Sequence, residues 1–255
     1  MWTLEKLQEQ LSEDRFKAFF RIHYNLNAPH ICRAETLIMY IDDNGSLVYP
    51  TTFIPELEGN GLIPALDKWM LEKACVIQEK LRESNVDVIQ IYVNLSSWTV
   101  CNPYDIYDIV MSLDNHRVNH NAINFSFTST KPYLSMYGLN KGLTYLQQKN
   151  RRIMLSHFGS ACNTIGMLRD VKFDIIQIDD EFVKKAMTSE RNEIMLKDII
   201  SMCHELNTTI VLGGVDNLSE FQYAKTLNCE YAIGNYFGRK LTETEFVRMQ
   251  RNKTR

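Results

Sequence analysis

The chain has 255 residues, 45% of them hydrophobic, which is enough for one large domain with a full core. A formal net charge of −3 provides no overall field that would attract nucleic acid or a membrane surface, so we expect neither as a partner. No apolar run reaches roughly 18 residues, the length that a membrane-spanning helix needs, and the N-terminal segment lacks a signal-peptide core. Six cysteines without a C-x-x-C pair are typical of reduced thiols, so we expect a cytoplasmic location.

Strand-like and helical patterns alternate along the chain, and no Pro-, Gly- or Ser-rich linker divides them. An amphipathic helix at 3–12 precedes a core of about 15–241, and a short basic segment ends the chain. Strands are predicted at 16–24, 33–41, 88–94, 122–128, 152–156, 173–178, 209–213 and 231–233. Further helices are predicted at 64–83, 104–113, 138–149, 165–168, 190–206, 219–227 and 242–251, with a loop at 53–63 and helix caps at Ser160 and Ser219.

This alternation predicts an α/β fold, a TIM-type (β/α)8 barrel formed by residues 1–255 as a single domain. An open doubly wound sheet is the alternative. No G-x-G-x-x-G or P-loop follows a predicted strand, so the usual nucleotide-binding signals of open sheets are absent. The central unit is the stretch 151–179, a strand, turn, helix and strand in which Gly159 accepts the positive φ of a sharp turn.

Several short segments are shared with one known family. They are Glu35-Thr36-Leu37, Phe53-Ile54-Pro55, Gly61-Leu62-Ile63, Val93-Asn94-Leu95-Ser96, Phe158-Gly159, Ile178-Asp179 and Phe182-Val183. Over about 15–241 the sequence resembles the EAL family of cyclic di-GMP phosphodiesterases. The resemblance implies a modified barrel whose first strand runs against the others. It also implies a bacterial signalling protein whose active relatives hydrolyse a phosphodiester with two Mg²⁺ or Mn²⁺ ions, held by carboxylates at the strand ends.

The positions that carry chemistry in this family are largely changed. By the resemblance, Glu35 and Asn94 keep two metal-ligand positions, and Asp216 shortens a family glutamate. The other acids and the catalytic lysine are replaced by Ser126, Ser129, Ser156, His157, Gln177 and Gly213. One carboxylate and one amide cannot hold two Mg²⁺ ions, so we expect no catalytic residues, no metal cofactor and no enzymatic activity.

The ligand-binding positions are changed as well. Met39 stands where the resemblance places an arginine that contacts the phosphate of the nucleotide, and Met cannot replace that contact. Cyclic di-GMP binding is therefore expected to be weak or absent. If the site binds a ligand, the candidates are Arg21, Glu35, Asn94, Asp179 and Asp216. His157 with Glu35 and a third ligand could hold one Zn²⁺, although an ordinary pocket histidine is the simpler interpretation.

Three functions remain open at this level. The first is an inactive EAL-like domain that acts as a regulatory module beside cyclic di-GMP signalling, through a protein partner or as a homodimer. The second is a receptor that binds cyclic di-GMP without cleaving it. The third is an active phosphodiesterase, or an enzyme with changed single-metal chemistry. The changes at Met39 and Arg21 favour the first, and fold alone cannot decide among them.

Overall fold

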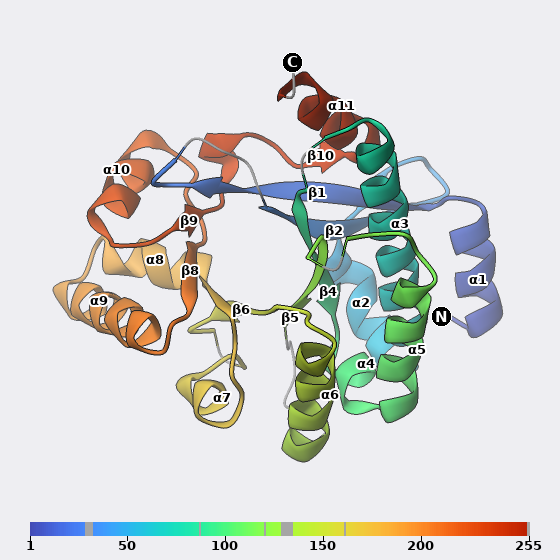
Figure 1. Ribbon diagram of the computed structural model, residues 1–255, viewed down its shortest axis with the longest axis horizontal. Coiled ribbons are helices and arrows are strands. Elements are labelled where there is room, and N and C mark those ends of the chain that lie inside the picture. The colour runs from blue at the N-terminus through green and yellow to red at the C-terminus, as the bar shows by residue number, and fades with distance from the viewer. Residues whose placement is uncertain (29–32, 87, 120, 129–134, 161, 254–255) are drawn as a thin grey trace.

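The computed structural model describes residues 1–28, 33–86, 88–119, 121–128, 135–160 and 162–253 (Figure 1). The strands are β1 (Phe16–Asn25), β2 (Arg33–Ile41), β3 (Leu47–Val48), β4 (Gln90–Leu95), β5 (Ile123–Phe127), β6 (Ile153–Phe158), β7 (Ile175–Ile178), β8 (Thr209–Leu212), β9 (Tyr231–Ala232) and β10 (Leu241–Thr242). The helices are α1 (Leu4–Ser12), α2 (Pro50–Gly59), α3 (Ile63–Glu83), α4 (Ser97–Cys101), α5 (Pro103–Asp114), α6 (Met136–Gln148), α7 (Ile165–Asp170), α8 (Asp180–Ala186), α9 (Glu190–Glu205), α10 (Leu218–Thr226) and α11 (Glu243–Lys253), with a 3₁₀ turn at Asn235–Phe237.

Eight of the strands in the described residues close into a barrel. From β2 through β4, β5, β6, β7 and β8 to β9, each strand pairs in parallel with the next. β1 completes the circle by pairing antiparallel with both β2 and β9. The predicted α/β barrel with a reversed first strand is therefore confirmed, and the open doubly wound sheet is wrong.

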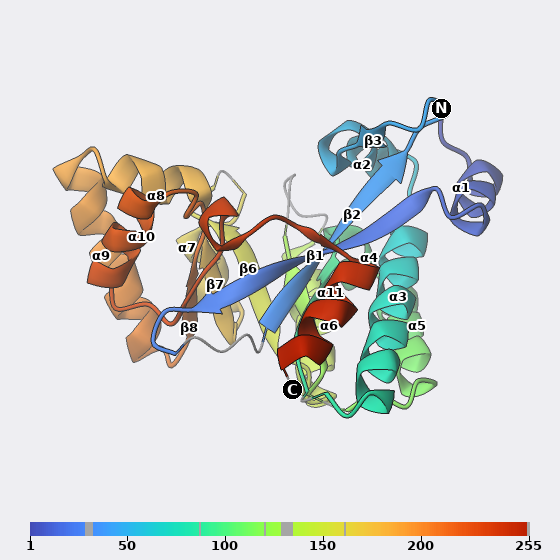
Figure 2. The same cartoon turned by 90° about the horizontal axis from the view of Figure 1, so that it is seen from above.

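Helices cover the outside of the barrel on its parallel side, and α11 covers β1 (Figures 1 and 2). The contact between α11 and β1 is aromatic, since the rings of Phe20 and Phe246 stack with centroids 4.5 Å apart. Lys80 of α3 reaches Glu243 of α11 at 2.7 Å. α11 thus protects the antiparallel strand that closes the barrel. No helix in the described part of the chain combines the length and apolar character needed to cross a bilayer.

The strands β5 to β9 are buried almost entirely on both faces, which explains their largely apolar sequences. Residues such as Ile91, Val93 and Leu95 face the helices in the main core. A separate interior cluster fills the barrel, with Tyr92, Met154, Ile175, Val211, Tyr231 and Ile233 as its members. Side chains alternate along a strand, so polar residues two positions beyond this cluster also point into the barrel.

The predicted loop at 53–63 is mostly helical. α2 begins at Pro50, where a missing N–H costs nothing, and ends at Gly59. Phe53 and Leu57, four residues apart, bury one face of α2 in a second core cluster with Leu7 of α1. Burial of this face outweighs the hydrogen bond that Pro55 removes from the helix.

Two predicted caps are also wrong. α7 begins after Thr164, and the Ser160 hydroxyl instead accepts a hydrogen bond from Asn163 Nδ2 at 3.4 Å. α10 begins after Asn217, whose side chain forms a capping box with Glu220, so Ser219 lies inside the helix. Gly159 does adopt a positive φ of 95°, as predicted. The short helices α4 and α8, directly after strand ends, were not predicted.

Close packing of α6 against α4 depends on a glycine. A Cβ added to Gly142 would lie 2.0 Å from the carbonyl oxygen of Val100. We expect Gly142→Ala to lower the free energy of unfolding by about 1–3 kcal/mol, because the helices must separate. Urea denaturation would measure this.

Gly166 in α7 provides the matched control. A Cβ there would meet nothing closer than Thr164 Oγ1 at 3.6 Å. Gly166→Ala should leave stability unchanged or raise it by up to about 1 kcal/mol through helix propensity. Equal effects of the two substitutions would contradict the proposed contact.

Candidate functional site

The carboxyl ends of the parallel strands meet at one end of the barrel, where barrel proteins carry their sites. Three uncharged side chains from neighbouring strands form a hydrogen-bonded chain there. Ser126 Oγ and Ser156 Oγ are 2.6 Å apart, and the Ser156 hydroxyl donates to Gln177 Oε1 at 3.2 Å. All three side chains are buried. The structure thus brings together three of the predicted site positions, and they satisfy one another without a charge.

Glu35 of β2 lies opposite Arg21 of β1, where the antiparallel strand closes the barrel. The two are direct partners in the antiparallel β1–β2 ladder, and Arg21 Nε lies 2.9 Å from Glu35 Oε1. His23 Nε2 is 3.8 Å from the other carboxylate oxygen. Burial would raise the pKa of Glu35, but Arg21 and His23 outweigh it and hold the pKa at about 2. Glu35 is therefore ionised and already paired.

His23 was not predicted as a site residue. It is fully buried, its ring stacks on Tyr92 with centroids 6.1 Å apart, and neither ring nitrogen has a hydrogen-bond partner in the described residues. Strand alternation could have found it, because Arg21 and His23 are two residues apart on β1 and share a face.

His157 is turned away from the serine chain. The β6–β7 pairing shifts register between Leu155 and Phe158, and His157 has a φ of 53°. Its side chain is 47% exposed, and Nδ1 lies 3.2 Å from Asp179 Oδ2. Asp179 also caps α8 by accepting from the amide of Glu181 at 3.0 Å. Among the residues that the structure describes, no three His, Cys, Asp or Glu side chains are placed to hold one metal ion.

Asp180 occupies the space beside Gly213. A Cβ at Gly213 would lie 2.1 Å from Asp180 Oδ1, so a side chain at position 213 and the present Asp180 exclude each other. Burial raises the pKa of Asp180, and the charges of Arg21 and His157 oppose this only in part. Oδ1 has no hydrogen-bond partner within the described ranges. Asp180 was not predicted as a site residue, although it directly follows the predicted Asp179.

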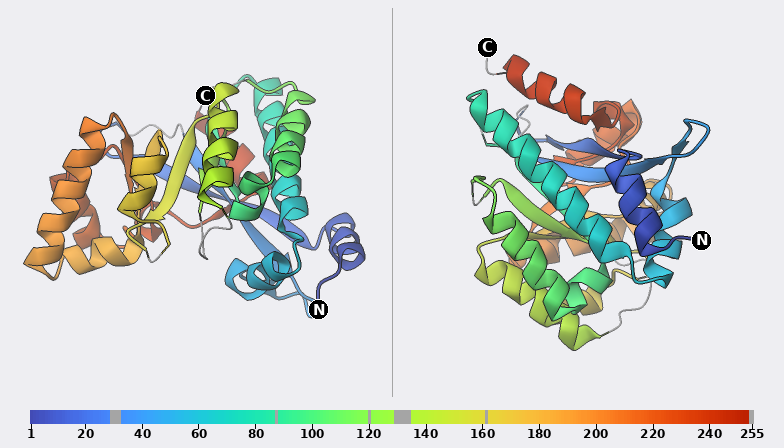
Figure 3. Two further views of the ribbon diagram at one scale, coloured as in Figure 1. Left: turned by 90° about the horizontal axis from the view of Figure 1, so that it is seen from below. Right: turned by 90° about the vertical axis from the view of Figure 1, so that its right-hand side faces the viewer.

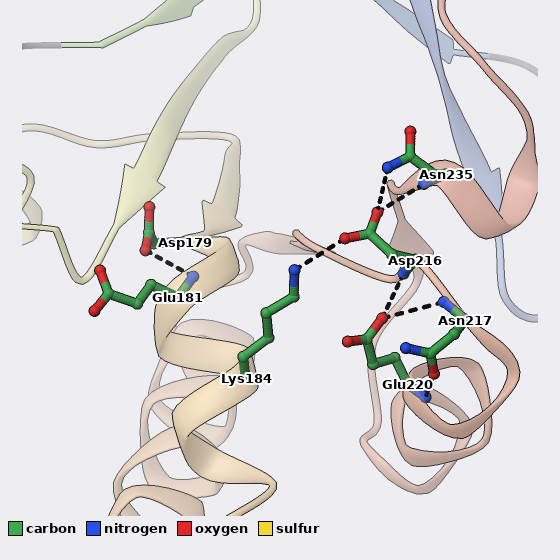
Figure 4. Close-up of polar contacts among 7 residues, drawn as sticks. All are labelled: Asp179, Glu181, Lys184, Asp216, Asn217, Glu220 and Asn235. Atoms are coloured by element: carbon green, nitrogen blue, oxygen red, sulfur yellow. Dashed lines mark hydrogen bonds and ion pairs between the residues drawn. The ribbon is translucent and has the colours of Figure 1, made fainter.

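Asp216 braces the loops at the edge of the site (Figure 4). Its carboxylate accepts from the Asn235 amide and Nδ2, each at 2.9 Å, and pairs with Lys184 Nζ at 2.9 Å. The backbone hydrogen bond from Asn235 lowers the pKa of Asp216, and Lys184 adds to this effect. Glu220 holds the backbone amide of Asp216 at 2.6 Å. Asp216 is therefore engaged in joining α8, the β8–α10 loop and the 3₁₀ turn.

The remaining predicted positions are structural or undescribed. Asn94 Nδ2 donates to the carbonyl oxygen of Thr36 at 2.9 Å, which ties the end of β4 to β2. Met39 is buried. Ser129 lies outside the described residues.

Together, the closed barrel with one reversed strand and the polar groups at the carboxyl ends of its strands define a (β/α)8 protein whose candidate site lies at the barrel mouth. The model of the EAL domain matches residues 4–240. The chain therefore belongs to the EAL domain family, and it is related to cyclic di-GMP phosphodiesterases and signalling proteins.

Individual relatives are distant in sequence. Signaling protein YkoW of Bacillus subtilis (strain 168) is 24% identical over 94% of this chain and 30% of its own length. Cyclic di-GMP phosphodiesterase NbdA of Pseudomonas aeruginosa is 22% identical over 97% of this chain and 32% of its own. The chain thus spans about a third of these curated relatives. The solved PaMucR phosphodiesterase in complex with cyclic di-GMP shares the fold, with a TM-score of 0.85 at 20% identity over 95% of this chain and 98% of that one.

The depressed pKa of Glu35 predicts a pH-dependent contribution to stability. Its pKa falls from the ordinary 4.5 to about 2, so ionised Glu35 stabilises the fold above about pH 4.5, and this is lost as the pH falls through about 2. We expect Glu35→Gln to cost about 3 kcal/mol at pH 7 and much less near pH 2, measured by urea denaturation.

The exposed Glu9 of α1 provides the control, since Glu9→Gln should show a small difference at every pH. A cost of Glu35→Gln that stays constant from about pH 7 to pH 2 would show that the Arg21 pair does not set this pKa.

Proposed function

We propose that this EAL domain is catalytically inactive and acts as a regulatory protein-interaction module in or beside cyclic di-GMP signalling. The observation that carries the proposal is the uncharged chain Ser126–Ser156–Gln177 at the centre of the barrel mouth. Family resemblance places acids and a lysine at these positions. Hydroxyl and amide groups that bond one another supply neither the charge nor the free base of a hydrolytic site.

The residues present do not fit two divalent cations. Mg²⁺ and Mn²⁺ need several oxygen ligands, and two ions close together need several carboxylates to offset their charge. Glu35 already pairs with Arg21 at 2.9 Å, and Asp216 already pairs with Lys184 at 2.9 Å. Loss of a single electrostatic element commonly costs about 10²–10³ in rate, so loss of several supports an inactive site.

We therefore expect the protein not to convert cyclic di-GMP to the linear dinucleotide, even with excess Mg²⁺ or Mn²⁺. Chromatography of the reaction mixture would measure this. The Glu35→Ala variant, which lacks the carboxylate, should likewise form no linear dinucleotide. Turnover by the parent protein that disappears in Glu35→Ala would overturn the proposal.

Introducing acids at the serine positions tests whether these positions share one pocket. Ser126→Glu with Ser156→Asp places two carboxylates in one buried contact, so the metal-free melting temperature should fall by several degrees. Mg²⁺ should recover part of this loss by binding the native state. His157→Asp, at an exposed position, should change it little. A double variant that melts like the parent would show that the two positions do not share a pocket.

One observation favours the receptor alternative. Burial lowers the pKa of Lys240, the positive charge of Arg21 lowers it further and the charge of Glu35 opposes this, so Lys240 and Arg21 act on each other electrostatically. Such a pair could meet a phosphate. Arg21, however, is already held by Glu35, and Met39 offers no charge.

We expect cyclic di-GMP to bind more weakly than about 10 μM in calorimetry, with or without Mg²⁺. Arg21→Ala and Lys240→Ala should not change a signal that weak. A submicromolar dissociation constant that rises in these variants would promote the receptor function over the interaction module.

A further inference from the structure

His116, which follows α5, has both ring nitrogens directed at carboxylates of α3. Nε2 lies 2.6 Å from Glu72 Oε2, and Nδ1 lies 3.3 Å from Glu79 Oε1. α3 and α5 run side by side on the outside of the barrel (Figures 1 and 3). The segment 115–118 leads from α5 toward the amino end of β5, so this contact lies at the end of the barrel opposite the candidate site.

Further hydrogen bonds tie the end of α5 and this segment to the same two carboxylates. Ser112 Oγ donates to Glu72, and the backbone amide of Arg117 donates to Glu79 Oε1 at 3.1 Å. Arg82 of α3 donates from Nη1 to the carbonyl oxygen of Arg117. Glu72 and Glu79 therefore act as hydrogen-bond acceptors toward groups other than the histidine as well.

Only one protonation state of the His116 ring satisfies both contacts. A neutral imidazole has one N–H and one lone pair, so it can donate to only one of two carboxylates. The imidazolium donates from both nitrogens. Because each ring nitrogen faces a carboxylate oxygen, the geometry fits the doubly protonated cation. Loss of either ring proton would turn a lone pair toward a carboxylate.

The charges of the contact favour the same state. Burial would lower the pKa of His116, but the hydrogen bonds and charges of Glu72 and Glu79 outweigh it and raise the pKa above the ordinary 6.5. Burial would raise the pKa of Glu72, but hydrogen bonds from Ser112 and His116 outweigh it and lower the pKa. The histidine and this glutamate thus hold each other in the charged form.

The other titratable groups nearby do not replace the histidine. Lys68 of α3 lies 2.7 Å from Asp108 of α5, so this cation is already paired. Burial, reinforced by the charges of the two glutamates, raises the pKa of Cys75 to about 12, so its thiol is neutral. Arg151, which precedes β6, acts electrostatically on Asp114 of α5 and on Cys75. In the part of the chain that the structure describes, the histidine is the one ionisable donor in contact with both glutamates.

We propose that His116 is a pH-dependent clamp, whose doubly protonated ring holds the segment 115–118 against α3 and whose neutral ring releases it. The ligand of this site is a proton. Because the pKa is raised in the folded state, the stabilisation is complete below about pH 6.5 and is lost as the pH rises through the folded-state pKa. The proposal goes beyond the proposed function, because the clamp would act whether or not the barrel mouth binds or cleaves cyclic di-GMP.

Nitrogen-15 NMR of the histidine rings, followed from about pH 5 to pH 9, tests the clamp in the parent chain. The signals of His116 are those that disappear in His116→Gln. Both ring nitrogens should be protonated at about pH 6, and the titration midpoint should move to lower pH in Glu72→Gln and in Glu79→Gln. A ring that is neutral at about pH 6, or a midpoint that neither variant changes, would contradict the clamp.

Amide hydrogen exchange tests the release of the segment, again in the parent chain. After correction for the intrinsic effect of pH, the protection of the Arg117 amide should fall several-fold above the titration midpoint of His116. The Asp216 amide is the matched control, because it also donates to a glutamate, Glu220 Oε2, at 2.6 Å. Its protection should stay constant. Equal behaviour of the two amides would show that the segment is not released.

Urea denaturation provides the matched pair of variants. The parent should be more stable than His116→Gln at about pH 6, and this difference should shrink toward about pH 9. His204 Nε2 lies 3.4 Å from the single carboxylate of Glu230, which a neutral ring can satisfy, so the effect of His204→Gln should change little with pH. A difference between the parent and His116→Gln that is independent of pH would overturn the proposal. Circular dichroism at about pH 6 would confirm that both variants are folded.

Discussion

Closure of the barrel by one strand that runs against all the others is the constraint on which the rest depends. β1 joins β2 and β9 through antiparallel ladders, so its side chains meet those of β2 in directly opposed pairs. This register places Arg21 opposite Glu35 and brings His23 to the same carboxylate. A chemical feature of the mouth therefore follows from the direction of one strand, and α11 is the element that keeps that strand covered.

The barrel mouth has uncharged, hydrogen-bonded groups on one side and paired charges on the other. On the parallel side, Ser126, Ser156 and Gln177 satisfy one another by hydrogen bonds at little electrostatic cost. Where β1 and β2 meet, the buried carboxylate of Glu35 keeps its charge because Arg21 and His23 lie beside it. These contacts join protein groups to one another, and they are the physical basis for our proposal that this EAL domain has a role other than hydrolysis.

The fold could be predicted largely from the sequence, because strand and helix periods alternate and β2 was placed with its observed bounds, Arg33–Ile41. α2 was missed because Pro55 and Gly59 suggest a loop, whereas burial of Phe53 is a tertiary effect. The contact between Ser126 and Ser156 could be predicted, because both residues lie near the ends of neighbouring strands. The outward orientation of His157 depends on a register shift between β6 and β7, and the burial of Asp180 depends on packing against Gly213. Neither effect can be predicted from local sequence patterns.

Because Asp180 packs against Gly213, the effect of a substitution at either position depends on the residue at the other. A side chain added at 213 would meet Asp180 Oδ1 at 2.1 Å and the carbonyl oxygen of Ile178 at 2.6 Å. A side chain at 213 therefore requires a shift of the backbone near Ile178, and Asp180 must move or change as well. A single substitution that adds any side chain at 213 is thus opposed by steric contact, whatever the chemistry of that side chain.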